Sequence, residues 1–426
     1  MDQMTSRRVL VVGMGISGMA TAKRLRMAGW EPVIVERASA RRLGGYFVVL
    51  FEAGRAAAER LGMLKHLHDR KSLQPGVDLT RSGKHRPGLS YVDMPGQPWL
   101  MVRGDVEQAA FAELPADIEV RYSTSPTEIV QDADGVDVTL LDARTGTSST
   151  ERFDLVIGAD GIRSTVRSLV FGPHEKFLHP LGYMIAAFEF PGTPEGLEPG
   201  VGATFLEPDR GMWVYAFTDR DPTIMLSYRT DDVAAERSRP AVESVRAAFG
   251  ANPPQTLVDV MNTLESSQTG LFDSADQVRM PTWHKGRVLL LGDSAWCVTV
   301  YAGMGVSSAL AGADLLGTML EQNPDDLESV LTEWERGMRP YVAYYQESGV
   351  KDRAFFVPDS KLQLLLRRLL PLAGRTRFGR RVIAKLLNAE DVIRYKNANI
   401  LTEVLGGSPQ QRKESQVDQR ARHSAA

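Results

Sequence analysis

The sequence predicts an α/β fold in which a parallel sheet covered by helices is interrupted by an inserted antiparallel sheet. Three observations support this fold class. Residues 8–12, 154–158 and 287–291 are short apolar runs that end at or beside glycine, as buried strands of parallel sheets do. A helical pattern and then a second apolar run follow the first of these strands. Between 173 and 280, strand-like segments replace the alternation of strands and helices.

The individual elements can be assigned in chain order. Residues 16–28 predict an amphipathic helix that ends at Gly29, and residues 32–36 predict the second strand of a βαβ unit. Asp134-Gly135 between two alternating runs predicts a β-hairpin. The remaining predicted elements are the helices 52–61, 104–114, 240–249, 255–265, 303–320, 325–348 and 360–404 and the strands 183–190, 201–206, 211–218 and 223–229.

The changes of pattern along the chain set the predicted domain boundaries. A discontinuous first domain is expected to close through a returning strand after the insert, and a C-terminal helical segment is expected to brace the two domains. The tail is polar and poor in apolar residues, so it is predicted to be disordered. The predicted parts are the first domain, 1–172 and 281–355; the inserted domain, 173–280; the helical segment, 356–405; and the tail, 406–426.

The bulk composition excludes several classes of function. The net charge of −3 gives no reason to expect a nucleic-acid partner or an anionic membrane surface. No apolar stretch is long enough to span a bilayer, and glycines break the N-terminal apolar run too soon for a signal peptide. Cys297 is the single cysteine, which rules out an intramolecular disulfide. We therefore expect no metal site and a cytoplasmic location.

A glycine-rich turn, Gly13-x-Gly15-x-x-Gly18, follows the first strand and opens the first helix. In such a turn the first glycine permits a tight bend, the second lets the backbone approach a pyrophosphate, and the third lets helix and strand pack closely. Ile16 and Ser17 begin the helix, where free amide groups and partial positive charge face the phosphates. The turn therefore predicts a phosphate-binding site.

The second strand ends at Glu36, eighteen positions after Gly18. A carboxylate at that place meets the hydroxyl groups of a ribose, whereas the alternative is a solvated strand end. Strand, helix and acid together favour dinucleotide binding. The acid favours a ribose without a 2′-phosphate, so these residues fit either FAD or NAD.

Three separated motifs, in a fixed order along the chain, carry a resemblance to a known family. They are the glycine-rich turn with Glu36-Arg37; Gly158-Ala159-Asp160-Gly161 with Arg163 and Val166-Arg167; and Gly292-Asp293-Ser294-Ala295 with Gly303-Met304-Gly305. Weaker matches are Val102-Arg103-Gly104-Asp105 and Trp334-Glu335-Arg336 with Arg339-Pro340. The chain resembles the single-component flavoprotein aromatic hydroxylases, the para-hydroxybenzoate hydroxylase class, and within it the tetracycline-inactivating and salicylate hydroxylase-like monooxygenases. The resemblance spans about residues 7–345, although 173–280 matches only in pattern.

The resemblance implies a Rossmann-like domain that binds FAD, with NADPH or NADH as co-substrate. It assigns cofactor contacts to residues of each motif. The alternatives are a helix N-cap for Asp293, a surface ion pair for Arg103 and a plain turn for Asp160-Gly161, and the motif context favours the cofactor contacts for Arg103 and for Asp160-Gly161. The implied cofactor-binding residues are Gly13, Gly15, Ile16, Ser17, Gly18, Glu36, Arg37, Gly45, Arg103, Asp160, Gly161, Asp293, Gly303, Met304 and Gly305.

The resemblance also implies a reaction. Reduced nicotinamide, expected to be NADPH, reduces FAD; O₂ adds at flavin C4a; and the hydroperoxide hydroxylates an aromatic or polycyclic small molecule, as in secondary metabolism. No catalytic side chain stands out, because His68, His85 and His284 are scattered and the cofactor carries the difficult step. Two alternatives stay open: an FAD-dependent reductase or oxidase without oxygen insertion, and a non-catalytic flavoprotein.

The third motif departs from the family pattern. Trp296 replaces the usual histidine, Thr299 and Val300 replace the usual pair of prolines, and Ser307 replaces a frequent asparagine. The prolines line the flavin face where oxygen reacts, so their loss keeps the oxidase alternative open. Cys297 lies in the same stretch and is interpreted as a small apolar residue.

The inserted domain offers an aromatic strand face. Side chains alternate along a strand, so Trp213, Tyr215 and Phe217 share one face. This face is either core against a helix or a flat wall on which a planar substrate stacks. Met225 and Arg229 share a face of the neighbouring strand, where Arg229 is either a partner for an acidic substrate or a solvated strand end.

Overall fold

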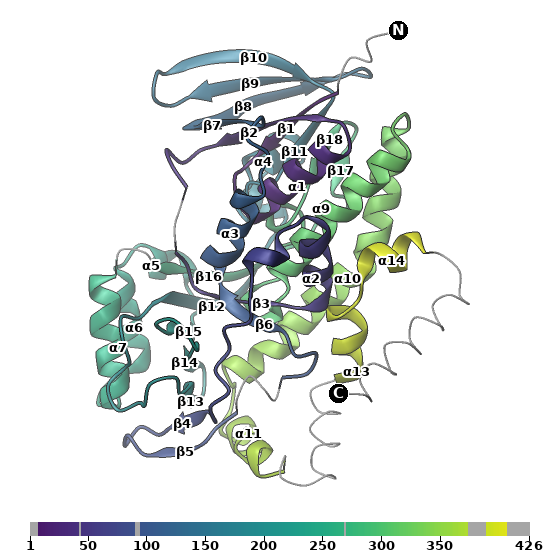
Figure 1. Cartoon of the computed structure of the whole chain (residues 1–426). Helices are drawn as coiled ribbons and strands as arrows, with labels where there is room; N and C mark the ends of the chain where they lie inside the picture. Colours follow the sequence, from purple (N-terminus) through teal and green to yellow (C-terminus); the bar gives the residue numbers. More distant parts are fainter. Residues whose placement is uncertain (1–6, 42–43, 90–93, 268–269, 374–388, 407–426) are drawn as a thin grey trace.

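A six-stranded, mostly parallel sheet lies at the centre of the first domain (Figure 1). The computed structural model describes residues 7–41, 44–89, 94–267, 270–373 and 389–406. The predicted apolar runs are adjacent in this sheet, because β1 pairs in parallel with both β2 and β11, and β11 pairs in parallel with β18. In spatial order the strands are β17 (His284–Lys285), β18 (Val288–Leu290), β11 (Leu155–Gly158), β1 (Arg8–Val12), β2 (Glu31–Glu36) and β7 (Glu119–Tyr122).

Helices α1 and α9 pack against each other beside this sheet. A separate three-stranded sheet contains the predicted hairpin, and its third strand was missed because that strand is polar and largely exposed. The remaining elements of the first domain are helices α1 (Ile16–Met27), α2 (Glu52–Arg60), α3 (Arg103–Ala112), α4 (Thr165–Val170), α8 (Asp293–Trp296), α9 (Gly305–Gln322), η1 (Leu64–His66) and η4 (Val300–Ala302), and strands β3 (Phe47–Leu50), β6 (Trp99–Val102), β8 (Thr124–Gln131), β9 (Val136–Asp142) and β10 (Thr147–Phe153).

The inserted sheet has seven strands, and two of them come from outside the predicted insert. Strands β4 and β5 belong to residues assigned to the first domain, and β4 joins the sheet through parallel pairing with β13. The predicted strand 211–218 ends early, and Phe217 makes only an isolated bridge to Lys71. In spatial order the strands are β16 (Leu271–Val278), β12 (Leu178–Glu189), β15 (Thr223–Arg229), β14 (Arg210–Tyr215), β13 (Ala203–Glu207), β4 (Val77–Leu79) and β5 (His85–Pro87).

The two faces of the inserted sheet bury against different partners. Met212 and Val214 face outward into a small core with the helices that cover the far side of the sheet in Figure 1. Trp213, Tyr215 and Met225 face inward and belong to the core of the first domain. The predicted strand alternation is therefore confirmed. The helices of the insert are η3 (His174–Lys176), α5 (Val233–Arg237), α6 (Ala241–Phe249) and α7 (Gln255–Ser266).

The C-terminal part departs from the predicted helices. Helix α10 (Leu327–Phe356) continues past the predicted end, and Gly349 within it packs closely against the loop at Thr299. The predicted helix 360–404 is wrong as one continuous helix, since the backbone leaves the helix after Lys396. Residues 374–388 and the predicted tail from 407 lie outside the described residues. The described pieces are α11 (Lys361–Ala373), α13 (Ala389–Asp391), the π-helix η5 (Val392–Lys396) and α14 (Ile400–Leu405). None of the helices in the described ranges combines the length and apolar character needed to cross a membrane.

Candidate cofactor and substrate site

The glycine-rich turn after β1 has the geometry that a pyrophosphate requires. Gly13 has a φ of +104°, and a Cβ there would lie 2.5 Å from the carbonyl oxygen of Ala159. A Cβ on Gly18 would overlap the carbonyl oxygen of Gly13, so α1 packs directly on the turn. A Cβ on Gly15 would meet nothing within 4 Å. The turn is therefore closed toward the protein at two glycines and open at Gly15, where a phosphate can approach the backbone.

The start of α1 offers donors at this opening. Ile16 is buried and Ser17 is partly exposed. Among the described residues, no side chain caps the helix at Gly15, so the first-turn amides are available to an anion. Glu36 lies beside the turn, and its carboxylate accepts hydrogen bonds of 2.8 Å from the amides of Met14 and Ala38. Its contact with a ribose stays a prediction.

The structure brings the three motifs together. Gly13 of the first motif packs on Ala159 of the second, and Ser17 lies beside Gly292 of the third. Arg37, by contrast, is exposed at the end of β2. The convergence of separated motifs on one turn is what a single cofactor site requires.

Asp160 and Ser294 hold the second motif to the third. The carboxylate of Asp160 accepts two amide hydrogen bonds at the start of α4 and one from the Ser294 hydroxyl at 3.3 Å. The amide of Gly161 donates to the same hydroxyl at 2.8 Å. Arg167 is fully buried and donates to the Ser294 carbonyl at 2.9 Å. These bonds give the Asp-Gly motif a structural role, and its direct contact with a cofactor stays a prediction.

Asp293 and Tyr46 both lie close enough to Arg103 for its charge to affect their pKa values. Asp293 has accessible surface, yet burial among protein atoms raises its pKa, an effect that Arg103 opposes. Burial also raises the pKa of Tyr46, and Arg103 again opposes the shift. We infer that a bound cofactor would lie beside these three residues, and we refer to this region as the candidate cofactor cavity. One N–H of Arg103 donates to Glu107 at 2.7 Å, and the guanidinium carries four more. A carboxylate for hydroxyls and a cation for phosphate fit the ribityl and pyrophosphate portions of FAD.

Three glycines lie near this region, and each of them has close neighbours or a positive φ. A Cβ on Gly45 would lie 3.1 Å from the Cβ of Arg103, and its φ is +141°. The predicted helix at 303 begins two residues later, because Gly303 adopts the left-handed conformation with a φ of +65°. Met304 is fully buried, and a Cβ on Gly305 would lie 3.8 Å from Oδ1 of Asp293. Asp293 and the start of α9 are therefore neighbours, as the predicted site requires.

Trp296 points into the core. Its ring lies 4.7 Å from that of Trp283 and 5.8 Å from that of Trp334 between centroids, and its Nε1 donates to Ser308 at 3.1 Å. Gly312 makes room for it, since a Cβ there would lie 3.1 Å from the ring. The substitution of the usual histidine is thus accommodated by packing.

The rest of the departing stretch contacts strands of the inserted sheet. The thiol of Cys297 donates a hydrogen bond to the carbonyl oxygen of Asp276 at 3.7 Å. Burial raises the pKa of this thiol well above the usual value, and the nearby charge of Asp293 adds to the effect, which keeps the thiol protonated. Thr299 is buried with a φ of +72°, a conformation closed to proline. The hydroxyl of Tyr301 lies 2.6 Å from that of Ser227 on β15. No sequence pattern indicates the contacts of Cys297 and Tyr301, because they join residues far apart in the chain.

The aromatic face of the insert is buried toward the first domain. The rings of Tyr215 and Phe47 are stacked with centroids 3.4 Å apart, and Trp213 is nearly parallel to Tyr215 at 6.1 Å. Trp213 Nε1 donates to the carbonyl of Phe356 at 3.1 Å. Phe217 is 4% exposed, so all three predicted aromatic residues are core residues in this structure.

The predicted residues on β15 lie in different surroundings. Met225 is fully buried, with its sulfur 3.9 Å from the Tyr215 hydroxyl. The side chain of Arg229 is 55% exposed and lies 3.6 Å from Asp209. Arg229 is therefore the solvated strand end that one of the two alternatives predicted.

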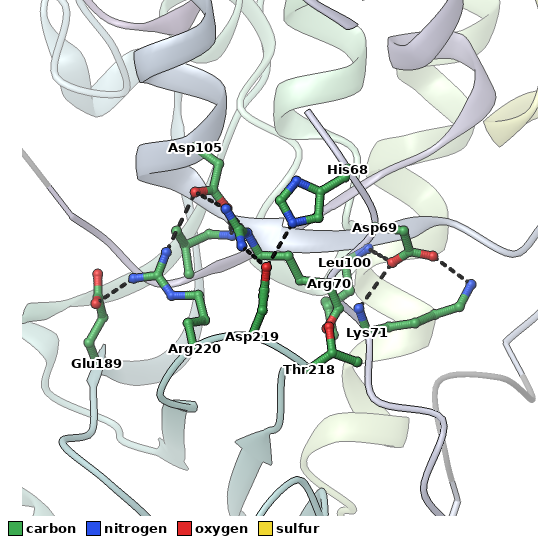
Figure 2. Close-up of polar contacts among 11 residues, drawn as sticks. His68, Asp69, Arg70, Lys71, Leu100, Asp105, Glu189, Thr218, Asp219 and Arg220 are labelled. Carbon is green, nitrogen blue, oxygen red and sulfur yellow. Dashed lines mark hydrogen bonds and ion pairs between the residues drawn. The ribbon is translucent and has the colours of Figure 1, made fainter. Parts of the chain in front are cut away.

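A network of charges fixes the inserted sheet to the first domain. Arg70 lies between the carboxylates of Asp105 and Asp219 (Figure 2). Arg220 lies 3.5 Å from Asp105 and 2.7 Å from Glu189 at the end of β12. Asp105 belongs to α3, the helix that also carries the predicted phosphate ligand, so the network sets the position of the sheet relative to the cavity. Within the described ranges, no group of three or more His, Cys, Asp or Glu side chains is placed to hold a metal ion.

Comparison with known proteins agrees with this geometry. The family model of the FAD binding domain matches residues 6–323. A flavin-dependent monooxygenase of Legionella longbeachae is 27% identical over 365 residues, which cover 83% of this chain and 90% of that protein. An uncharacterized protein of Mycobacterium tuberculosis is 30% identical over 344 residues, which cover 76% of this chain and 87% of that protein.

Solved structures share the fold. The tetracycline destructase Tet(55) aligns with a TM-score of 0.73 at 24% identity, over 90% of this chain and 97% of that one. Klebsiella pneumoniae HpxO, complexed with FAD and uric acid, aligns with a TM-score of 0.71 at 20% identity, over 90% of this chain and 96% of that one. The family match contains all three motifs that meet at the turn after β1. The chain therefore belongs to the FAD binding domain family, and it is an FAD-dependent oxidoreductase of the flavin-dependent monooxygenase type.

Proposed function

We propose that the protein uses NADPH and O₂ to hydroxylate a planar aromatic or polycyclic small molecule held between FAD and the inner face of the inserted sheet. The observation that carries this proposal is the direction of the aromatic face. Trp213 and Tyr215 point toward the first domain, and Tyr215 stacks on Phe47, the residue after Tyr46 of the cofactor cavity. These rings are buried in this structure, but they lie where the inserted sheet meets the first domain, and a flat substrate bound at this boundary would stack on them.

Different residues of the cavity would bind different parts of FAD. The open side of the turn at Gly15 and the guanidinium of Arg103 would hold the pyrophosphate, and Glu36 would hold the adenosine ribose. Asp293 would accept hydrogen bonds from ribityl hydroxyls, and the start of α9 at Gly305 would face the flavin. FAD held by these residues would supply the redox chemistry that activates O₂ for transfer to the substrate.

The protein contributes position and exclusion of water. Burial raises the pKa of Tyr301, so its phenol stays neutral and can donate a hydrogen bond at neutral pH. The pair of Tyr301 and Ser227 lies where the loop before α9 meets the inserted sheet. Hydroxyl groups on a largely aromatic surface are suited to orienting a hydroxylated ring.

The test is turnover under ¹⁸O₂ with NADPH or NADH and a panel of planar compounds. The panel contains tetracycline and uric acid, after the structural neighbours, together with salicylate and para-hydroxybenzoate. We expect one member to accelerate NADPH oxidation and to gain one ¹⁸O atom. Acceleration without label would support a reductase or oxidase, and a panel that never accelerates nicotinamide oxidation would contradict the substrate class.

A further inference from the structure

A buried lysine of the C-terminal segment reaches the loop that precedes α9. Lys396, the last residue of η5, is 5% exposed. Its ammonium group donates to the carbonyl oxygen of Ala302 at 3.0 Å and lies 3.3 Å from a carboxylate oxygen of Asp352. It also lies 5.5 Å from the centroid of the Phe51 ring. Burial of an ammonium group is unfavourable without partners, and these three contacts compensate for it.

The carbonyl that Lys396 binds belongs to the loop between Asp293 and α9. Ala302 precedes Gly303, whose left-handed backbone turns the chain into α9. Neither Thr299 nor Val300 fixes its own φ as proline would. The loop therefore depends on contacts from outside for its conformation, and Lys396 provides one from the side of the C-terminal segment.

The lysine is itself held in place. The next residue, Asn397, donates to the carbonyl of Gly96 at 3.0 Å and accepts from the amide of Glu52 at 3.3 Å. The preceding carbonyl, of Tyr395, accepts from the Tyr345 hydroxyl at 2.8 Å. A lysine fixed on both sides holds its charge at a defined point. Burial lowers the pKa of Lys396, and the carboxylate of Asp352 opposes that change.

We propose that Lys396 is a positioning residue for the flavin: it fixes the loop at Ala302 and places a positive charge behind the start of α9, so that the site favours the more negative, reduced FAD. This inference rests on the proposed placement of the flavin beside Gly303–Gly305. No local pattern in the sequence indicates this role of Lys396, because the residue lies C-terminal to every motif that carries the family resemblance.

The experiment measures the midpoint potential of bound FAD and the Kd for oxidised FAD. Lys396→Met is expected to weaken the preference for reduced over oxidised FAD about tenfold, which moves the potential of a two-electron couple about 30 mV more negative. Lys396→Arg keeps a cation and donors and should restore at least half of the shift. Lys351→Met is the matched control, since Lys351 is an exposed lysine of α10 paired with Glu347, and it should leave the potential unchanged.

If Lys396→Met fails to retain FAD, a second variant tests whether the charge of Lys396 affects the midpoint potential. Asp352→Asn removes the partner anion and keeps the bond from Lys396 to Ala302, so the potential should become more positive. An unchanged or more negative potential in Asp352→Asn, or an unchanged potential in FAD-replete Lys396→Met, would overturn the proposal. Both measurements need FAD but no substrate. A failure to find a hydroxylated product would therefore contradict the proposed function without affecting this result.

Discussion

The nucleotide end and the flavin end of the cavity are built in different ways. The nucleotide end, Gly13–Gly18 with Glu36, lies within one βαβ unit, where Gly13 has a positive φ and Gly18 packs directly on Gly13 of the same turn. The flavin end, the loop 296–305 with its contacts, depends on Arg103 and Lys396 from distant parts of the chain. Local backbone geometry can be deduced from a short motif, whereas a site assembled by tertiary contacts cannot. Variants in the two ends should therefore fail in different ways.

The largest effect is expected at the nucleotide end. Gly18→Ala places a methyl group on the Gly13 carbonyl, so α1 must move and little folded, FAD-binding protein should remain. Gly15→Ala meets open space, so the apoprotein should keep its Tm. The same methyl group occupies the approach of the pyrophosphate, and the Kd for FAD should rise on the order of 100-fold.

Calorimetry of the apoproteins and titration with FAD measure these two effects separately. Wild-type affinity in Gly15→Ala would show that the open side of the turn is not the phosphate site. The two variants thus distinguish a glycine that is required for packing, Gly18, from one that is required for the approach of the ligand, Gly15.

The next effect concerns the aromatic face. Trp213→Ala removes a buried ring together with its hydrogen bond to Phe356, so the free energy of unfolding should fall by about 3–5 kcal/mol. If the face also holds the substrate, FAD-replete protein should bind it with about 1.5–3 kcal/mol less free energy and release more hydrogen peroxide. Trp213→Phe keeps a ring and is the milder control. A stable, FAD-replete Trp213→Ala with unchanged substrate affinity and peroxide yield would remove this face from the active site.

The sequence predicted those parts of the molecule whose cause is local. Gly13 could be assigned because the tight turn directly after β1 needs a positive φ, which favours glycine. The inward direction of Trp213 and Tyr215 followed from strand alternation alone. Strand β10 was missed because its side chains are polar and exposed, so no apolar period marks it.

Contacts between distant residues could not be predicted in the same way. The hydrogen bond between the hydroxyl groups of Tyr301 and Ser227 joins two domains, and the sequence around either residue does not predict this contact. Strand β4 joins the inserted sheet through pairing with β13, which lies more than a hundred residues further along the chain. A motif specifies its own backbone, but the partner across a fold is set by the whole topology.

The loop at the flavin end offers a sharper test of this difference. Thr299→Pro restores the residue type usual in the family, but proline requires a φ near −65° and Thr299 has +72°. The free energy of unfolding should therefore fall by about 3 kcal/mol or more. Thr299→Gly accepts the conformation and should change stability by only about 1 kcal/mol, because relieved strain offsets the lost methyl contact at Gly349. Denaturant unfolding measures both, and equal stability of the proline variant would show that the loop can follow the family backbone.

The smallest effect concerns Glu335, which secures the strand leading to Asp293. One carboxylate oxygen of Glu335 accepts hydrogen bonds from Thr282, the Trp283 amide and His284. Burial alone would raise the pKa of Glu335, but the bonds from His284, Trp283 and Arg339 lower it to about 2. The folded pKa thus lies below the ordinary value of 4.5, so the ionised carboxylate stabilises the fold fully above pH 4.5 and progressively less as the pH falls toward 2.

Glu335→Gln should accordingly lower the free energy of unfolding by about 2–3 kcal/mol at pH 7, and the difference from wild type should shrink between pH 4.5 and 3. Glu333→Gln is the matched control on the same helix: its carboxylate is 42% exposed and paired with Arg336, so the change should stay below about 1 kcal/mol. A deficit in Glu335→Gln that does not vary with pH would assign the effect to packing. In that case the charge of Glu335 would not stabilise the turn before β18. The apolar contacts of the strand alone would then determine the position of Asp293.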